Sequence, residues 1–196
     1  MFTDETYQFN GQTYHYWHKG AWADTERAAE IPIAKRFMEK GGSILEIGNV
    51  MRPHFPKLDH LVIDLDEKRE GWENYENADV LTYQPKQDFG RVLTISTLEH
   101  TNDMVAAIRR VLSWSDNVLI SVPLGYNTPG GYHTNTAVFE HNYPAELSVL
   151  AREKSDPRRW FEMSPAEARE LGFAHFQYGR DFSIGASAIA LFHRNL

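Results

Sequence analysis

Short apolar runs alternate with helical patterns through the middle of the chain. Runs rich in leucine, isoleucine and valine predict strands at Ile44–Ile47, Leu61–Asp64, Asp79–Thr82, Val92–Ser96 and Val118–Val122. Strands that alternate with helical segments are typical of βαβ units and a mainly parallel sheet. The pattern therefore predicts an α/β fold.

The clearest helical pattern lies between the last two predicted strands. Its apolar stripe has helical spacing and consists of Met104, Val105, Ile108, Val111 and Leu112, with Thr101 as the expected N-cap. The connection over residues 49–59 contains two prolines, and the segment after Asp66 has no helical period. Since a parallel crossover needs about a dozen residues, we expect some crossover helices to be reduced to turns.

The N-terminal segment predicts a β-hairpin followed by a helix. Tyr7–Phe9 and Thr13–Trp17 flank the dipeptide Asn10-Gly11, which supplies the positive φ angles of a two-residue turn. Asp24 is the expected cap of a helix that runs through Ile31, and Pro32 can lie in the first turn of a following segment to Lys40. Pro32 should break or kink this helix, because proline removes a backbone donor and its ring clashes with the preceding turn.

The C-terminal third predicts one helix and a closing pair of strands. Ser164–Glu167 forms a capping box with proline at the first helical position. Ala174–Tyr178 and Ser187–His193 have the pattern of an antiparallel strand pair. With no repeat or clear linker, we expect a single domain over residues 1–196. Residues 1–40 would form a hairpin and helical cap, and residues 41–196 the core.

Charge and length narrow the range of partners. The chain has 196 residues, enough for a sizeable core, and a formal net charge of −7. A protein that binds nucleic acid through phosphates usually carries a basic excess, so a small-molecule partner is favoured over nucleic acid. The densest basic run, residues 152–159, also contains acids. It is typical of a solvated loop, with a phosphate-binding patch as the alternative.

Residue types that are missing exclude several chemistries. The chain has no cysteine, so disulfides, thiolate metal sites and a cysteine nucleophile are excluded. No apolar run approaches the roughly 20 residues that span a bilayer, and the acidic N-terminus is unlike a signal peptide. We therefore expect a cytoplasmic location without a membrane partner. No His-x-x-x-His spacing places two histidines on one helical face, so no metal is expected.

Two predicted strands end in residues suited to a nucleoside ligand. The first leads into Gly48, and the second ends in Asp64. Ligands of open α/β sheets bind at the carboxyl ends of the strands. There, N–H groups of a glycine turn can meet an anion, and a carboxylate can hold a ribose diol. The pair therefore indicates a nucleoside cofactor.

The order of these motifs resembles the class I S-adenosylmethionine-dependent methyltransferases, including small bacterial members. The similar stretches are Glu26–Pro32, Ile44–Val50, Val62–Asp64, Ala78–Val80, Thr94–His100 and Val118–Asn127. The resemblance implies a Rossmann-like, mainly parallel sheet with a C-terminal antiparallel strand pair. It also implies methyl transfer from S-adenosylmethionine to a small polar acceptor, such as a sugar or sugar-nucleotide hydroxyl. One departure is Val50, which stands where the superfamily usually has a second glycine.

The resemblance assigns the cofactor's tail and ribose to the first two strand ends. Gly48 and Asn49 would turn the chain so that backbone N–H groups approach the methionine part, although an ordinary strand-to-helix turn has the same residues. Asp64 would accept hydrogen bonds from both ribose hydroxyls, or else simply end a strand in solvent. Glu46, an acid within an apolar strand, would support the glycine turn or pair with Arg27.

The resemblance assigns the adenine and the reactive methyl to residues later in the chain. Asp79 would accept a hydrogen bond from the exocyclic amine of adenine, and the Val80 N–H would serve the ring nitrogen. Ser96 and Thr97 end the fourth strand, where the reactive methyl lies in this superfamily. A structural role for Asp79 is an equally good interpretation.

Acceptor chemistry is expected beyond the fourth strand. Since the sulfonium already activates the methyl group, positioning supplies most of the acceleration, and the acceptor needs at most a base. His100 is the first choice for that base and Glu99 the second; a histidine bonded to backbone at a helix start is the alternative for His100. The long loop after the fifth strand holds the expected acceptor-binding residues Tyr126, Asn127, His133 and His141.

Two other functions remain open at this point. A non-catalytic member of the same fold could sense a ligand or contact a protein partner, and Val50 in place of glycine favours this alternative. A nicotinamide-dependent oxidoreductase is the weaker alternative, because the pattern G-x-G-x-x-G is absent.

Overall fold

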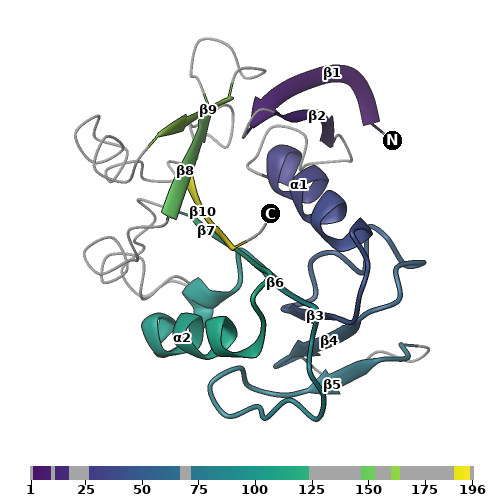
Figure 1. The fold of residues 1–196 in the computed structure, drawn as a ribbon, viewed down its shortest axis with the longest axis vertical. Helices are drawn as coiled ribbons and strands as arrows, with labels where there is room; N and C mark the ends of the chain where they lie inside the picture. Colours follow the sequence, from purple (N-terminus) through teal and green to yellow (C-terminus); the bar gives the residue numbers. More distant parts are fainter. Residues whose placement is uncertain are drawn as a thin grey trace.

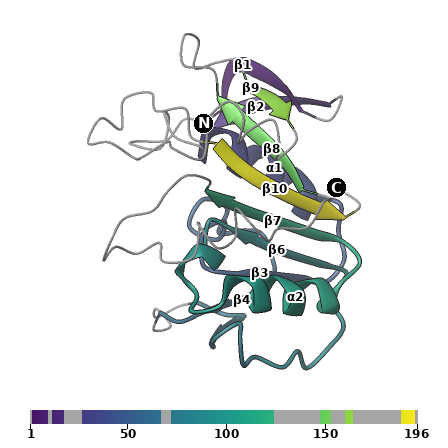
Figure 2. The same cartoon turned by 90° about the vertical axis from the view of Figure 1, so that its left-hand side faces the viewer.

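A central sheet with helices on both faces organises the protein (Figures 1 and 2). The computed structural model describes residues 2–9, 12–17, 27–66, 72–123, 147–152, 160–163 and 188–194. The eight strands of the sheet have the order β5-β4-β3-β6-β7-β10-β8-β9. The first five of these are parallel, whereas β10 is antiparallel to β7 and β8, and β9 is antiparallel to β8. This order is a Rossmann-like α/β arrangement.

Four of the five predicted core strands are confirmed, as β3 (Ile44–Ile47), β4 (Leu61–Asp64), β6 (Arg91–Ile95) and β7 (Val118–Pro123). The strand predicted at Asp79–Thr82 is wrong, because β5 lies earlier, at Tyr75–Asn77. The carboxylate of Asp79 accepts a hydrogen bond from the Leu81 N–H at 2.8 Å, which forms a turn that competes with strand pairing.

Helix α1 (Arg27–Glu39) runs through Pro32 without ending, so the predicted break is wrong. Residues on both sides of the proline are fully buried against the sheet, including Ile31, Ile33 and Phe37. This burial outweighs the hydrogen bond that proline removes, which costs about 3 kcal/mol. The predicted cap Asp24 lies outside the described residues.

Helix α2 (Met104–Trp114) confirms the second helical pattern, but its cap differs from the prediction. Asp103, not Thr101, accepts the N–H of Ala106 at 2.9 Å. Thr101 instead donates its hydroxyl hydrogen to the Leu98 carbonyl at 2.7 Å, at the end of the short 3₁₀ helix η2 (Leu98–His100). Between β3 and β4 the fully described chain forms only turns, as expected for a shortened crossover.

The two helices pack on opposite faces of the sheet, with α1 behind and α2 in front in Figure 2. Strand β6 shows the alternation that produces these two layers. Val92 belongs to the cluster that contains α2, whereas Leu93 and Ile95 belong to the cluster that contains α1. None of the described helices is long and apolar enough to cross a membrane.

The N-terminal hairpin is confirmed as β1 (Phe2–Phe9) and β2 (Gln12–Trp17), whose pairing of Phe9 with Gln12 leaves a two-residue connection. The last predicted strand is found as β10 (Ala188–Arg194), between β7 and β8 (Leu147–Arg152). The edge strand β9 spans Trp160–Met163. The predicted partner Ala174–Tyr178 and the capping box Ser164–Glu167 lie outside the described residues.

The strand order creates one switch point. From β3 the chain moves outward through β4 to β5 and then returns to β6 on the other side of β3. The connections that leave β3 and β6 therefore diverge, which opens a crevice at the carboxyl edge of the sheet.

Candidate functional site

A cavity of about 500 Å³ lies at this carboxyl edge, within the size range of small-molecule sites. Most of the predicted cofactor residues line it, namely Gly48, Asn49, Asp64, Asp79, Val80 and Thr97. They come from the ends of β3, β4 and β6 and from the turn after β5. The structure therefore brings these six residues together around one cavity. Glu46 and Ser96 are not among the lining residues.

Gly48 occupies a position that no other residue fits. Its φ of +77° lies in the left-handed region that favours glycine. A Cβ at this position would lie 2.2 Å from Oγ1 of Thr97 and 2.8 Å from Cβ of Thr97. The backbone of the turn after β3 thus packs directly on the side chain of Thr97, two residues beyond the end of β6.

The N–H groups of the turn are engaged within the protein. Gly48 donates to the Ile63 carbonyl at 2.9 Å, and Asn49 donates to Oδ2 of Asp64 at 2.8 Å. Val50 and Met51 both donate to Oε1 of Glu46, at 2.7 and 2.5 Å. This differs from the expectation that these N–H groups face a ligand anion.

Glu46 is the centre of this arrangement and is fully buried. Its Oε1 accepts the two turn N–H groups, and its Oε2 lies 2.6 Å from Nε2 of His60. Nδ1 of His60 lies 3.0 Å from the Leu58 carbonyl oxygen, which can only accept, so Nδ1 donates. A proton must then lie between Nε2 and the carboxylate. Glu46 therefore supports the turn from behind, one of the two roles expected for it.

Asp64 keeps capacity for a ligand despite its internal bonds. Its Oδ2 accepts the Asn49 N–H and its Oδ1 accepts the Asp66 N–H at 3.0 Å. An ionised carboxylate has about four acceptor positions, so about two remain for the hydroxyls of a diol. Asp79 similarly uses Oδ1 for the Leu81 N–H.

A second buried carboxylate lies on the α1 face, behind the end of β6. Oε1 of Glu30 accepts the hydroxyls of Ser96 at 2.8 Å and Ser121 at 2.6 Å, while Oε2 pairs with Nη1 of Arg27 at 2.7 Å. Arg27 therefore pairs with Glu30, whereas the sequence suggested Glu46 as an alternative partner. Ser96 has a φ of +40°, which is strained for a serine. Its side chain faces α1, whereas the next residue, Thr97, faces the cavity.

Sequence reasoning did not assign site roles to Glu30, His60 and Ser121. A signal existed for Glu30, since it is an acid between alanine and isoleucine on a helix with a buried face. His60 and Ser121 carry no local signal, because their partners lie far away along the chain.

His100 and Glu99 are adjacent but differ in environment. The His100 side chain is 43% exposed and lines the cavity, whereas the Glu99 side chain is 1% exposed and is not among the lining residues. Their nearest Nε2–Oε1 distance is 3.9 Å. The structure therefore favours His100 over Glu99 for contact with a ligand. The expected acceptor residues Tyr126, Asn127, His133 and His141 lie outside the described residues.

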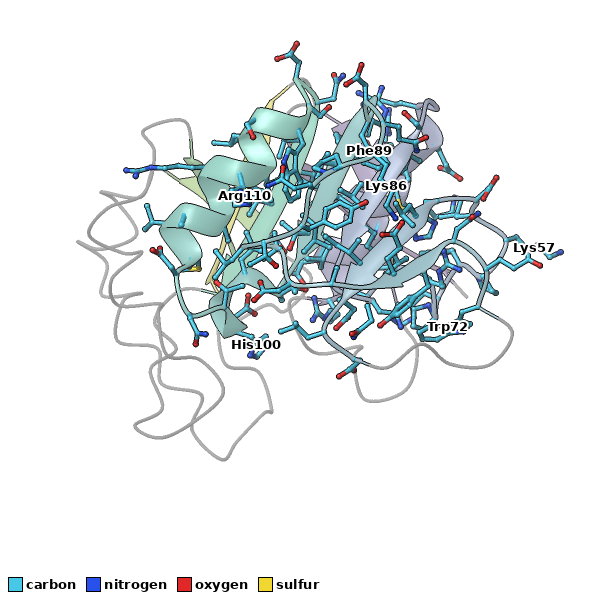
Figure 3. The ribbon with its side chains drawn as sticks, turned by 90° about the horizontal axis from the view of Figure 1, so that it is seen from below. Lys57, Trp72, Lys86, Phe89, His100 and Arg110 are labelled. Carbon is cyan, nitrogen blue, oxygen red and sulfur yellow. The ribbon has the colours of Figure 1, made fainter. Side chains whose placement is uncertain are left out.

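The amino edge of the sheet holds a different cavity of about 420 Å³, lined in part by Glu76, Tyr83 and Lys86. Figure 3 shows His100 at the lower end of the drawn side chains and Lys86 well away from it, near the middle of the view. Burial raises the pKa of Tyr83, and the hydrogen bond to Glu76 raises the pKa of Lys86. Within the described ranges, no group of three or more His, Cys, Asp or Glu side chains could hold a metal.

No protein-family profile and no curated protein sequence matches this chain. Solved structures give similarities of fold. The plantazolicin methyltransferase BpumL, solved with a triazolic desmethylPZN analog and SAH, has a TM-score of 0.46 and 13% identity over 84% of this chain and 82% of its own. The 16S rRNA methylase RmtB has a TM-score of 0.42 and 18% identity over 87% of this chain and 64% of its own. Coclaurine N-methyltransferase, solved with N-methylheliamine and SAH, has a TM-score of 0.38 and 18% identity over 56% of this chain and 40% of its own.

This chain therefore spans 64% of the length of RmtB and 40% of the coclaurine enzyme. TM-scores below 0.5 and identities of 18% or less carry no argument about activity. The strand order and the cavity described above are independent of these similarities.

Proposed function

We propose that this chain binds S-adenosylmethionine in the cavity at the carboxyl edge and transfers its methyl group to a polar acceptor. The observation that carries the proposal is the joint placement of Gly48 and Asp64. They follow neighbouring parallel strands, line one cavity, and are linked through the hydrogen bond from the Asn49 N–H to Asp64. A glycine turn beside a strand-end carboxylate at a switch point suits a nucleoside ligand.

The residues present fit such a cofactor. Asp64 has acceptor capacity for the two ribose hydroxyls, and the free oxygen of the Asp79 carboxylate would take the adenine amine, with the Val80 N–H at the ring. Gly48 and Thr97 both line the cavity, and a Cβ at Gly48 would displace the Thr97 side chain. The methionine tail would then lie toward Asn49 and His100.

When bound, S-adenosylmethionine supplies a methyl group already activated by a sulfonium. The chain's own contribution is to bind, orient and exclude water. His100 is the proposed base, because it lines the cavity and remains accessible to an acceptor, and neutral imidazole can take a hydroxyl or ammonium proton near neutral pH. Buried Glu99 beside it would act through His100 rather than touch the acceptor.

The net charge of the chain narrows the chemical class of the acceptor. A formal net charge of −7 disfavours a polyanionic partner, so we propose a small polar acceptor, with a sugar or sugar-nucleotide hydroxyl as the first class to screen. An RNA acceptor would make methyl incorporation depend on added RNA and fall steeply with salt, and this result would replace the small-molecule assignment.

Replacing Asp64 tests the cofactor site. Asp64→Ala should weaken S-adenosylhomocysteine binding at least about tenfold, because two charge-assisted hydrogen bonds are lost. Calorimetric titration of wild type and variant measures the change. Asp66→Ala is the matched control, since Asp66 lines the same cavity and should affect binding less. Equal affinity of wild type and Asp64→Ala would contradict the ribose assignment.

Replacing His100 separates binding from chemistry. His100→Gln should reduce methyl transfer at least about a hundredfold and leave cofactor affinity within about threefold, as expected for loss of a general base. The measurement is radiolabelled methyl incorporation across a panel of acceptors. Undiminished turnover would remove His100 from this role.

A non-catalytic ligand sensor is the second candidate function. The complete engagement of the turn N–H groups from Gly48 to Met51 favours it, because these groups are not available to a cofactor carboxylate. Such a sensor would gain no thermal stability from S-adenosylmethionine or S-adenosylhomocysteine and would transfer no methyl to any acceptor class.

A further inference from the structure

Among the described residues, those that line the carboxyl-edge cavity carry acidic side chains without basic ones. Asp64, Asp66 and Asp79 line it, whereas no lysine or arginine is among its described lining residues. His100 is the one lining side chain in that described set that can become cationic. Such walls attract positive groups on a ligand and repel negative ones.

The backbone of the turn adds no compensating donors for a carboxylate. All four N–H groups from Gly48 to Met51 donate to protein acceptors at 2.5–3.1 Å. Two of them donate to the fully buried Glu46. If these two N–H groups turned toward a ligand, the buried carboxylate would lose two of its hydrogen bonds. The turn therefore does not become an anion site at low cost.

The other side-chain donors in the described part of the cavity wall bind an anion weakly. Asn49 and Asn102 line the cavity with neutral amides, and His100 is exposed to water. Neutral hydrogen bonds in a wet site contribute little net binding. By contrast, Oδ1 of Asn49 is a buried acceptor that receives no hydrogen bond from any described residue.

We propose that this cavity recognises its adenosine ligand by the ribose, the adenine and the positive groups of the tail, and gains little from the tail's carboxylate. The ammonium would donate to the Asn49 amide oxygen, within the field of the three aspartates, and this would require the amide to rotate so that its buried oxygen faces the cavity. This inference rests on the proposed function, because it concerns the same cofactor site. The ligand class is an adenosine thioether or sulfonium that carries an amine.

The test compares three ligands in calorimetric titrations with the full chain. They are S-adenosylhomocysteine, its decarboxylated analogue S-adenosyl-3-thiopropylamine, and the deaminated analogue that keeps the carboxylate. We expect the decarboxylated compound to bind as tightly as S-adenosylhomocysteine or up to about tenfold more tightly, because a repelled carboxylate is removed. The deaminated compound should bind at least about tenfold more weakly.

A variant assigns the amine to its acceptor. Asn49→Ala should weaken S-adenosylhomocysteine and the decarboxylated analogue by about the same factor, at least fivefold, and should leave the deaminated analogue unchanged. Asn49→Asp is the matched control, since it keeps an acceptor oxygen and should retain or strengthen binding of both amines. A purely structural effect of Asn49→Ala would weaken all three ligands equally and would overturn the role of Asn49.

The remaining outcomes separate this inference from the proposed function. If S-adenosylhomocysteine binds and the decarboxylated analogue binds more than tenfold more weakly, the carboxylate is recognised and the inference is wrong, while the cofactor assignment stands. If no adenosine ligand binds, both the inference and the proposed function fall.

Discussion

Two buried glutamates hold the carboxyl edge of the sheet in different ways. Glu46, on β3, binds the N–H groups four and five residues further along and His60 fourteen residues away. Glu30, on α1, binds serine hydroxyls 66 and 91 residues away and an arginine three residues before it. The first carboxylate shapes the turn that borders the proposed cofactor site. The second fastens α1 to the ends of β6 and β7.

The difference between their nitrogen partners decides how each site should respond to a neutral side chain in place of the carboxylate. The His60 ring can accept a hydrogen bond at Nε2 while it donates from Nδ1 to the Leu58 carbonyl. The guanidinium of Arg27 only donates and stays charged. We therefore expect a neutral amide to substitute well for Glu46 and poorly for Glu30.

The largest expected effect follows from changing Glu30. Glu30→Ala should lower the free energy of unfolding by roughly 3–5 kcal/mol, because it breaks a buried ion pair. Glu30→Gln should lose nearly as much, since a neutral amide forms no ion pair with the guanidinium of Arg27 in this buried site. Urea denaturation measures both. A Glu30→Gln variant as stable as wild type would show that the charge of Glu30 is not needed.

The second-largest expected effect is on Glu46, and it differs from that on Glu30 in how well a neutral amide replaces the carboxylate. Glu46→Ala should lose about 3 kcal/mol, whereas Glu46→Gln should lose about 1 kcal/mol or less, because its amide oxygen accepts both turn N–H groups and its nitrogen donates to neutral His60. Equal losses for the two Glu46 variants in the same urea experiment would contradict this account. Glu46→Ala should also weaken S-adenosylhomocysteine binding, whereas Glu30→Ala should change it less than about threefold.

The central strands and the main site residues were predictable because their signals are local. Apolar runs bounded by a glycine or an acid mark β3 and β4, and the rule for open sheets brings Gly48 and Asp64 to one edge. The Asp79–Thr82 strand was not predictable from apolar content alone, since the side chain of Asp79 ties its own backbone into a turn. The true strand, Tyr75–Asn77, has only one buried residue.

The buried polar contacts could not be predicted from the sequence. Glu30 meets Ser96 and Ser121 only after the sheet has formed, and His60 meets Glu46 across a turn with no helical or strand period. The continuity of α1 through Pro32 likewise depends on burial against the sheet rather than on local propensity.

The smallest effect concerns the strained end of β6. Ser96→Ala removes the hydroxyl bonded to Glu30 and keeps the φ of +40°, so it should cost about 1–2 kcal/mol. Ser96→Gly loses the same bond but relieves the strain, which is worth about 1 kcal/mol or more. The glycine variant should therefore be the more stable of the two in thermal unfolding. The reverse order would show that the backbone at Ser96 is not strained.

The central claim is that the turn held by Glu46 and the end of β4 border a cofactor site. Nuclear magnetic resonance of ¹⁵N-labelled protein titrated with S-adenosylhomocysteine tests this most directly. We predict the largest amide shifts at Gly48, Asn49, Leu65 and Val80, around the carboxyl-edge cavity, and small shifts at Lys86 on the opposite edge. Shifts centred on Lys86, or none at saturating ligand, would contradict the claim.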